Sequence, residues 1–128
     1  MTTQISLIAL VVPDYDEALA FYVDKLAFTL TKDIDLGAKK RWVTVSPNGG
    51  GTEILLARAA DDAQRSAIGN QTGGRVGFFL STTDFDTDYS NMRTQGVHFE
   101  EEPRQEPYGR VVVWCDPFGN RWDLIEYA

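Results

Sequence analysis

The chain has 128 residues, of which 43% are hydrophobic and 24% are charged, as in an ordinary soluble globular protein. This length suits one domain with a substantial core, or two small modules that share one. The formal net charge is −7, and the acidic residues are scattered along the chain. Such a balance argues against nucleic acid and against an anionic membrane surface as partners.

The number of cysteines and the N-terminal sequence indicate the cellular compartment in which the protein is expected. Cys115 is the only cysteine, which excludes an internal disulfide and a thiolate zinc cluster. It ends an apolar run that begins at Val111, so we expect a buried, unreactive thiol. The chain shows no signal peptide and no apolar stretch of membrane-spanning length. We therefore expect a cytoplasmic protein.

The first half of the chain predicts a strand, a helix and three further strands. Residues 5–12 are apolar and β-branched and predict a buried strand, which Pro13 ends. Asp14, with Glu17 three residues later, predicts the N-cap of a helix that continues to Leu26. Three more strands are expected, over residues 28–34, 41–46 and 52–58.

The second half repeats this order after a polar linker, residues 59–73, in which a short helical turn is expected within 59–68. A strand is predicted over residues 76–81, followed by a helix that Thr83 or Asp84 caps and Gly96 ends. The remaining strands are expected over residues 97–101, 110–115 and 121–127.

The two halves also match residue for residue at their turns and caps. The matching residues all lie 70 positions apart (84 − 14 for the first pair): Asp14 and Asp84, Pro47 and Pro117, Gly49 and Gly119, Glu53 and Asp123. Four matches in one register predict a duplicated unit. Each sheet has one face covered by its helix, so the other face needs a second sheet or a ligand. We expect an α+β fold, with two tandem βαβββ modules (1–58 and 74–128) curved into an open, mixed β-barrel with the helices outside. The whole chain, 1–128, would then be a single domain.

Three segments resemble the vicinal oxygen chelate superfamily, which includes glyoxalase I, bleomycin-resistance proteins and extradiol dioxygenases. They are Ile8 to Phe28, Thr52 to Leu56, and Gly109 to Glu126 with its Asp-Pro-Phe-Gly-Asn turn. The resemblance covers essentially the whole chain. It implies paired βαβββ modules and a homodimer.

The resemblance also implies where a metal would bind. In metal-dependent members, a histidine lies seven residues before the Asp-x-Asp helix start, and a carboxylate on the last strand of each module completes the half-site. Counting back from Asp14 and Asp84 gives Leu7 and Gly77, which are not ligands, whereas Glu53 and Asp123 are acidic. Two carboxylates alone would coordinate a divalent metal incompletely. We therefore expect no metal ligands and no cofactor, a divalent metal being disfavoured.

Glu53 and Asp123 are the candidate catalytic pair, since two acids that face one cavity can share a proton. The alternative is that each acid is hydrogen-bonded or ion-paired for structural reasons. Alternation along the strands places further side chains on the cavity wall. The candidate ligand-binding residues are Leu7, Ala9, Leu55, Arg75, Gly77, Phe79 and Ile125, with Tyr108 at the rim beside Arg104 and Arg110.

Two other residues are assigned structural roles. Trp122 neighbours Asp123 and so should point to the opposite face of its strand, where it would pack. His98, the only histidine, does not match a family ligand position, so we expect it at the surface or partly packed and not as a base or a lone ligand.

Three functions remain open from the sequence. The first is a metal-free protein that binds a small molecule in the barrel cavity, as bleomycin-resistance proteins do. The alternative is a divergent enzyme of the superfamily, of lyase, isomerase or dioxygenase type, which would use Glu53 and Asp123 or an atypically bound metal. The third is a purely structural module, because a fold does not determine a function.

Overall fold

The computed structural model describes all 128 residues and divides into two compact units, Met1–Ile68 and Gly69–Ala128. Each unit is built around one mixed β-sheet. The α+β fold class is therefore confirmed, with two curved sheets and no closed barrel. No helix is long and apolar enough to span a membrane.

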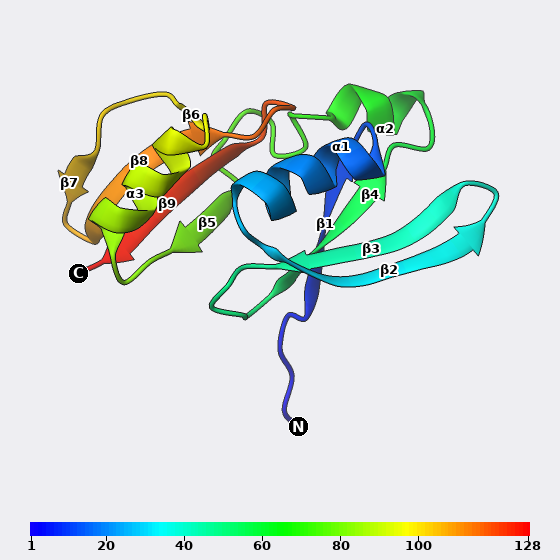
Figure 1. The fold of residues 1–128 in the computed structure, drawn as a ribbon, viewed down its shortest axis with the longest axis horizontal. Helices are drawn as coiled ribbons and strands as arrows, with labels where there is room; N and C mark the ends of the chain where they lie inside the picture. The colour runs from blue at the N-terminus through cyan, green and yellow to red at the C-terminus, as the bar shows by residue number, and fades with distance from the viewer. The chain divides into compact units, whose positions relative to one another are not determined.

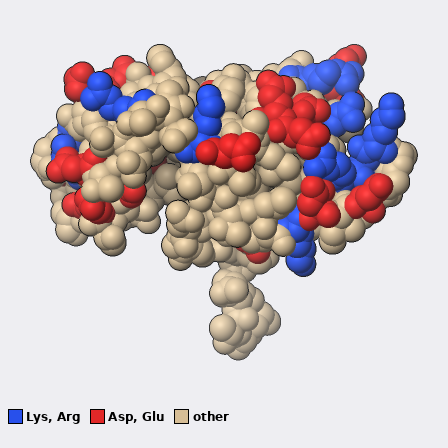
Figure 2. All heavy atoms as spheres, viewed as in Figure 1, with Lys and Arg blue, Asp and Glu red and all other residues tan.

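Unit 1 holds a four-stranded sheet in the order β1-β4-β3-β2. Strands β1 and β4 are parallel, and the other neighbours are antiparallel. Its elements are β1 (Leu7–Val12), α1 (Tyr15–Leu19), η1 (Ala20–Lys25), β2 (Thr29–Gly37), β3 (Lys40–Ser46), β4 (Glu53–Arg58) and α2 (Asp62–Ala67). The N-terminal residues before β1 extend away from this sheet as an arm (Figure 1). Figure 2 shows no charged side chain on that arm, and acidic and basic side chains interspersed elsewhere on the visible face.

The first helix begins where the sequence predicts. The Asp14 carboxylate accepts a hydrogen bond from the Glu17 backbone N–H at 2.9 Å, which caps the helix. Its continuation, η1, is a π-helix that the sequence did not predict. The wider turn closes through the Leu26 N–H, which donates to the Phe21 carbonyl at 3.0 Å. Tyr15, Ala18 and Tyr22 are buried on the face of the helix that covers the sheet.

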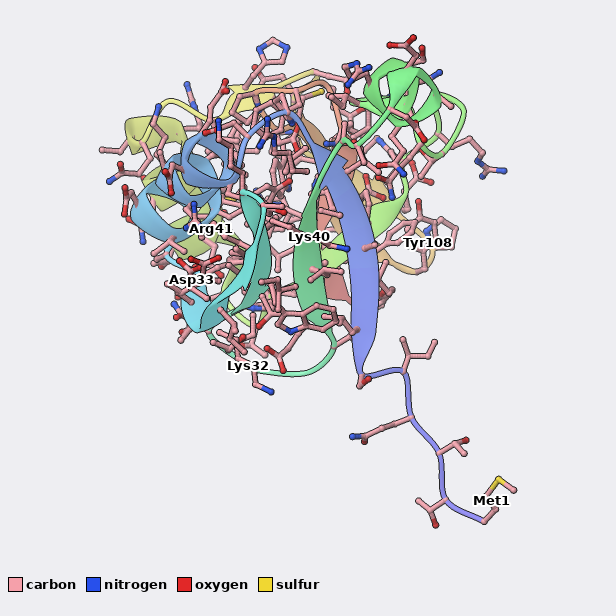
Figure 3. The ribbon with its side chains drawn as sticks, turned by 90° about the vertical axis from the view of Figure 1, so that its right-hand side faces the viewer. Met1, Lys32, Asp33, Lys40, Arg41 and Tyr108 are labelled. Carbon is pink, nitrogen blue, oxygen red and sulfur yellow. The ribbon has the colours of Figure 1, made fainter.

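An arginine ties the β2–β3 hairpin to α1. The Arg41 guanidinium bonds to Asp33 at 2.7 Å and to Asp16 at 2.9 Å, and it lies over the Tyr15 ring. Hydrogen bonding to Arg41 lowers the pKa of Asp33. Figure 3 shows Asp33 and Arg41 together on the hairpin, with Lys32 directed away from them. This cluster lies on the face of the sheet that carries α1, so it does not cover the other face.

Unit 2 repeats the arrangement with the order β5-β9-β8-β6. Its elements are β5 (Phe78–Ser81), α3 (Phe85–Thr94), β6 (His98–Phe99), β7 (Arg104–Glu106), β8 (Gly109–Cys115) and β9 (Arg121–Tyr127). Here β5 and β9 are the parallel pair, as β1 and β4 are in unit 1. Asp84 caps α3, and Gly96, with φ +83°, follows the helix as expected.

A stack of three aromatic rings forms the core between the sheet and α3. Trp122 lies between Phe78 and Trp114, with ring centroids 4.8 and 4.9 Å away. All three side chains are buried. Trp122 thus packs on the face opposite to Asp123, which confirms its predicted role.

The edge of the second sheet differs from the prediction. One strand was expected over residues 97–101, but β6 spans only two residues, and an unpredicted strand, β7, also pairs with β8. Between them the Glu101 carboxylate accepts the backbone N–H of Val113 at 3.0 Å. A side chain therefore takes the place of a strand carbonyl at this interruption, which the alternation of the sequence does not reveal.

Candidate functional site

The face of each sheet that points away from its helix is called here the open face. In unit 1, Leu10, Val12 and Leu56 are buried on the helix side, so the alternate residues of β1 and β4 line the open face. Leu7 stands opposite Glu53, and Ala9 opposite Leu55, in the parallel register. Four of the expected wall residues thus share one face within this unit.

Glu53 is tethered on this face by Thr31, which in turn contacts Thr44. The Thr31 hydroxyl hydrogen-bonds to Glu53 Oε1. The same hydroxyl lies 2.6 Å from the Thr44 hydroxyl and 3.0 Å from the Thr44 carbonyl oxygen. Thr44 is buried, and Glu53 is half-buried. Sequence reasoning missed both threonines, because a bulge in β2 between Leu30 and Lys32 brings Thr31 towards β3.

Two large apolar side chains remain exposed along the hairpin. Ile34, which pairs with Trp42, is 48% exposed, and Leu36 is 50% exposed. In unit 2, Phe79 is 59% exposed. Most large apolar residues on the opposite faces are buried, but Ile8 and Leu30 there are 42% and 41% exposed.

Asp123 has a different environment from Glu53. It is only 6% exposed, and its Oδ1 has no hydrogen-bond partner. Phe79 stands opposite it on β5, and Val113 on β8. Burial raises the pKa of Asp123, a shift that Arg104 and Arg121 oppose and Glu101 reinforces.

The two nearby cations are bound to other carboxylates. Arg104 bonds to Glu101 at 3.1 Å and to Glu106 at 2.6 Å. Arg121 bonds to Glu100 at 2.8 Å, and its other nitrogen donates to the Gly74 carbonyl. Neither arginine therefore satisfies the free oxygen of Asp123.

The pairing of β5 with β9 corrects which residue of unit 2 corresponds to Leu7. Leu7 lies opposite Glu53, and the corresponding residue opposite Asp123 is Phe79, two residues after Gly77. The offset of 70 holds for the caps and the last strands but becomes 72 for the first strands. Space beside Gly77 is also filled, because a Cβ there would lie 2.2 Å from the Thr72 methyl group.

The remaining predicted residues lie at varied depths. Arg75 is exposed before β5, and its carbonyl accepts the Thr72 hydroxyl at 2.6 Å. Ile125 is buried opposite Ser81, and Tyr108 is 50% exposed in the turn between β7 and β8.

The expectation for Arg110 is wrong. Its guanidinium bonds to Asp86 at 2.7 Å and lies 4.4 Å from the centroid of the Phe85 ring. The side chain therefore points towards α3 and not along the open face. Its place in the alternation of β8, next to Val111, explains this direction.

The residues present do not fit the metal that the family resemblance implies. Leu7 and Phe79 stand opposite the two acids and offer no donor atom. Neither unit holds a group of three or more His, Cys, Asp and Glu side chains placed to bind a metal ion.

A separate hollow of about 600 Å³ lies along the edge of unit 2. It is open and shallow, and it is lined by the C-terminal half of α3 and the β6 segment: Tyr89, Arg93 and residues 96–102. Neither Asp123 nor Phe79 contributes to it. The hollow is thus distinct from the open face that the sequence predicts as the site.

Known proteins resemble this chain over nearly its whole length. The family model of the Glyoxalase/Bleomycin resistance protein/Dioxygenase superfamily matches residues 4–124. An uncharacterized protein of Shewanella frigidimarina (strain NCIMB 400) is 51% identical over 121 residues, which cover 93% of this chain and 90% of that protein.

Two solved structures share the fold at comparable identity. UcmS2 has a TM-score of 0.84 and 29% identity, with 98% of each chain covered. TnmS3, an antibiotic binding protein from Streptomyces sp. CB03234, has a TM-score of 0.80 and 28% identity, with 99% of this chain and 98% of that one covered. The order of elements in the two units and the family-model match over residues 4–124 agree. The chain belongs to the Glyoxalase/Bleomycin resistance protein/Dioxygenase superfamily.

Proposed function

We propose that this chain binds a small molecule, without a metal ion, on one of the open faces of its two sheets. The observation that carries the proposal is the exposure of large apolar side chains on those faces, namely Ile34, Leu36 and Phe79. Apolar side chains that stay exposed on the face of a sheet, with polar groups beside them, are typical of ligand sites. A bound molecule would remove that surface from water.

Two further observations support a binding role. Leu7 and Phe79, which cannot ligate a metal ion, stand opposite the two acids. TnmS3, which has the same fold at 28% identity, is an antibiotic binding protein. We extend this ligand type, a small-molecule antibiotic, to the present chain as part of the proposal.

A ligand panel tests the proposal. The full chain would be titrated with small-molecule antibiotics, including bleomycin-type glycopeptides, by calorimetry and by thermal unfolding. A ligand at a hundred times its Kd stabilises a protein by about 2.7 kcal/mol, which for a chain of this size raises Tm by roughly 10 °C. Absence of both heat and thermal shift across the panel would contradict the binding role.

A matched pair of variants locates the surface within unit 1. Ile34→Ser alters the open face, whereas Ile8→Ser alters the helix side of the same sheet at a similar exposure, 42% against 48%. Only the first should weaken binding if the open face is the site. Equal losses in both variants would place the ligand elsewhere.

The metal-free state, the homodimer and the cytoplasmic location belong to the same proposal. Elemental analysis of protein purified without chelator tests the first, and stoichiometric zinc, nickel, manganese or iron would overturn it. Light scattering and cell fractionation test the other two.

Acid–base catalysis is a second candidate, favoured by the raised pKa of Asp123. A raised pKa favours the protonated form of a carboxyl group, and that form can donate a proton to a bound substrate. Catalysed exchange of carbon-bound hydrogen for deuterium in hydroxy-carbonyl compounds, lost in Asp123→Asn, would establish this function. Exchange no faster than in buffer would leave binding alone.

A further inference from the structure

We propose that Asp123 is the polar recognition point of the binding surface, and that the ligand is a planar aromatic molecule carrying a neutral hydroxyl or N–H donor. The aromatic body would lie on Phe79, and the donor would bond to Asp123 Oδ1. This inference rests on the proposed function and specifies the ligand class.

The unpartnered oxygen is the first step of the argument. Buried polar atoms in folded proteins almost always have hydrogen-bond partners, since an unmatched one costs stability. Asp116, equally buried in the same unit, shows the usual case. Its carboxylate accepts the N–H groups of Phe118 and Asn120, each at 2.9 Å, and the Asn120 side-chain amide at 2.7 Å. Asp123 Oδ1 has no such partner, so a donor from outside the chain would complete it.

The surroundings of Asp123 favour a neutral donor over a cation. The charged groups that influence it are Glu101, Arg104 and Arg121. Both arginines are already engaged by glutamates. A cationic ligand would have to be stripped of water to reach a buried carboxyl group, which costs far more than desolvating a hydroxyl or amide.

Phe79 supplies the aromatic part of the argument. It is the register neighbour of Asp123 in the parallel pair, so both side chains leave the same face of adjacent strands. Its ring is 59% exposed, whereas Phe78 on the other face is buried in the aromatic stack. An exposed ring beside a buried acceptor matches a ligand with a flat apolar body and a donor at its edge. Oδ1 is buried without ligand, so a ligand donor reaches it only after the side chains around it move.

Two probe molecules that differ only in the donor test the inference. Binding of 2-naphthol and of 2-methoxynaphthalene to the full chain would be measured by ligand-observed NMR. We expect wild type to bind 2-naphthol about tenfold more tightly, as one hydrogen bond to a charged or buried acceptor allows. Asp123→Leu should abolish this preference while still binding both molecules. Phe79→Ser should weaken both molecules by a similar factor.

Asp123→Asn is the conservative control, since its amide oxygen still accepts a hydrogen bond and at least part of the preference should remain. Equal binding of the two probes by wild type, or a preference that survives Asp123→Leu, would overturn the role of Asp123 while the proposed function stands. If neither probe binds to wild type, the aromatic ligand class is wrong, and the antibiotic panel decides the proposed function separately.

Discussion

Replacing each of the two buried aspartates of unit 2 by asparagine should change stability in opposite directions. Asp116 and Asp123 are 5% and 6% exposed, respectively. The first carboxylate is satisfied by three hydrogen bonds, and the second has an oxygen with none. Burial is thus matched, and the hydrogen-bond partners differ.

The expected magnitudes follow from these contacts. Asp123→Asn replaces a group that can ionise at a site without a compensating partner. The free energy of unfolding should therefore rise by about 1 kcal/mol at neutral pH, which is the low end of the cost of an unsatisfied buried group. In Asp116→Asn, the new side-chain NH₂ group faces the NH₂ group of Asn120, so a donor replaces an acceptor and the turn is weakened. The free energy of unfolding should fall by about 1–2 kcal/mol. For 128 residues, unfolding entropy makes 1 kcal/mol equal to roughly 4 °C in Tm.

The effect of Asp123→Asn should depend on pH in a defined direction. The pKa of Asp123 is raised in the folded protein, so its neutral form stabilises the fold fully below the unfolded pKa, about 3.9. That contribution is lost as the pH rises through the folded pKa. The advantage of asparagine should therefore be absent near pH 3.5 and grow towards pH 8.

Thermal unfolding of wild type and both variants between pH 3.5 and pH 8 measures these differences. Asp123→Asn should raise Tm at pH 8 and match wild type at the acidic end, while Asp116→Asn lowers Tm at neutral pH. A loss of stability in Asp123→Asn comparable to that in Asp116→Asn would show that Oδ1 has a partner, and the reasoning on Asp123 would fail.

Three further predictions concern the helices, the core and the thiol. Asp14→Ala should cost about 1 kcal/mol of unfolding free energy and Asp84→Ala less, because their capping hydrogen bonds measure 2.9 and 3.4 Å, respectively. Urea titration of both variants measures the two losses, and a larger loss for Asp84→Ala would contradict the prediction. Trp122→Ala should cost about 3–5 kcal/mol, since its ring lies stacked in the core; a loss under 1 kcal/mol would refute the packing role. Burial, and to a lesser degree Glu100, raise the pKa of Cys115 to about 12. Iodoacetamide at pH 8 should therefore label Cys115 at least about a hundredfold more slowly than free cysteine. Labelling at the rate of free cysteine would contradict this prediction.

Much of the fold was predictable because local signals and the repeat agree. Asp14 and Asp84 cap their helices as expected, and Trp122 turns away from Asp123 because strand alternation is rigid. The π-helix after Leu19 and the short strand β7 were not predictable. The π-helix depends on a backbone hydrogen bond that widens a turn, and β7 follows an interruption at which a side chain replaces a strand carbonyl; no residue type marks either feature.

The site was less predictable, because it depends on register. Counting 70 residues from Leu7 leads to Gly77, yet the parallel pairing with β9 places Phe79 opposite Asp123. A shift of two residues keeps the same face and so leaves the alternation of apolar and polar residues unchanged. The sequence therefore predicts which face a residue lines but not which residue meets the acid.

The duplicated acids have become chemically unlike through their neighbours. In unit 1, Thr31 donates to Glu53, so that carboxylate already has a partner inside the chain. In unit 2, Phe79 and Val113 flank Asp123 and offer it no donor. An acid that its own unit satisfies has little left to give a ligand, whereas an unsatisfied one gains most from a donor. Equivalent places in a repeated fold therefore need not share a role, and the polar contact with a ligand should come from Asp123 of unit 2, with Glu53 holding the β2 edge of unit 1 through Thr31.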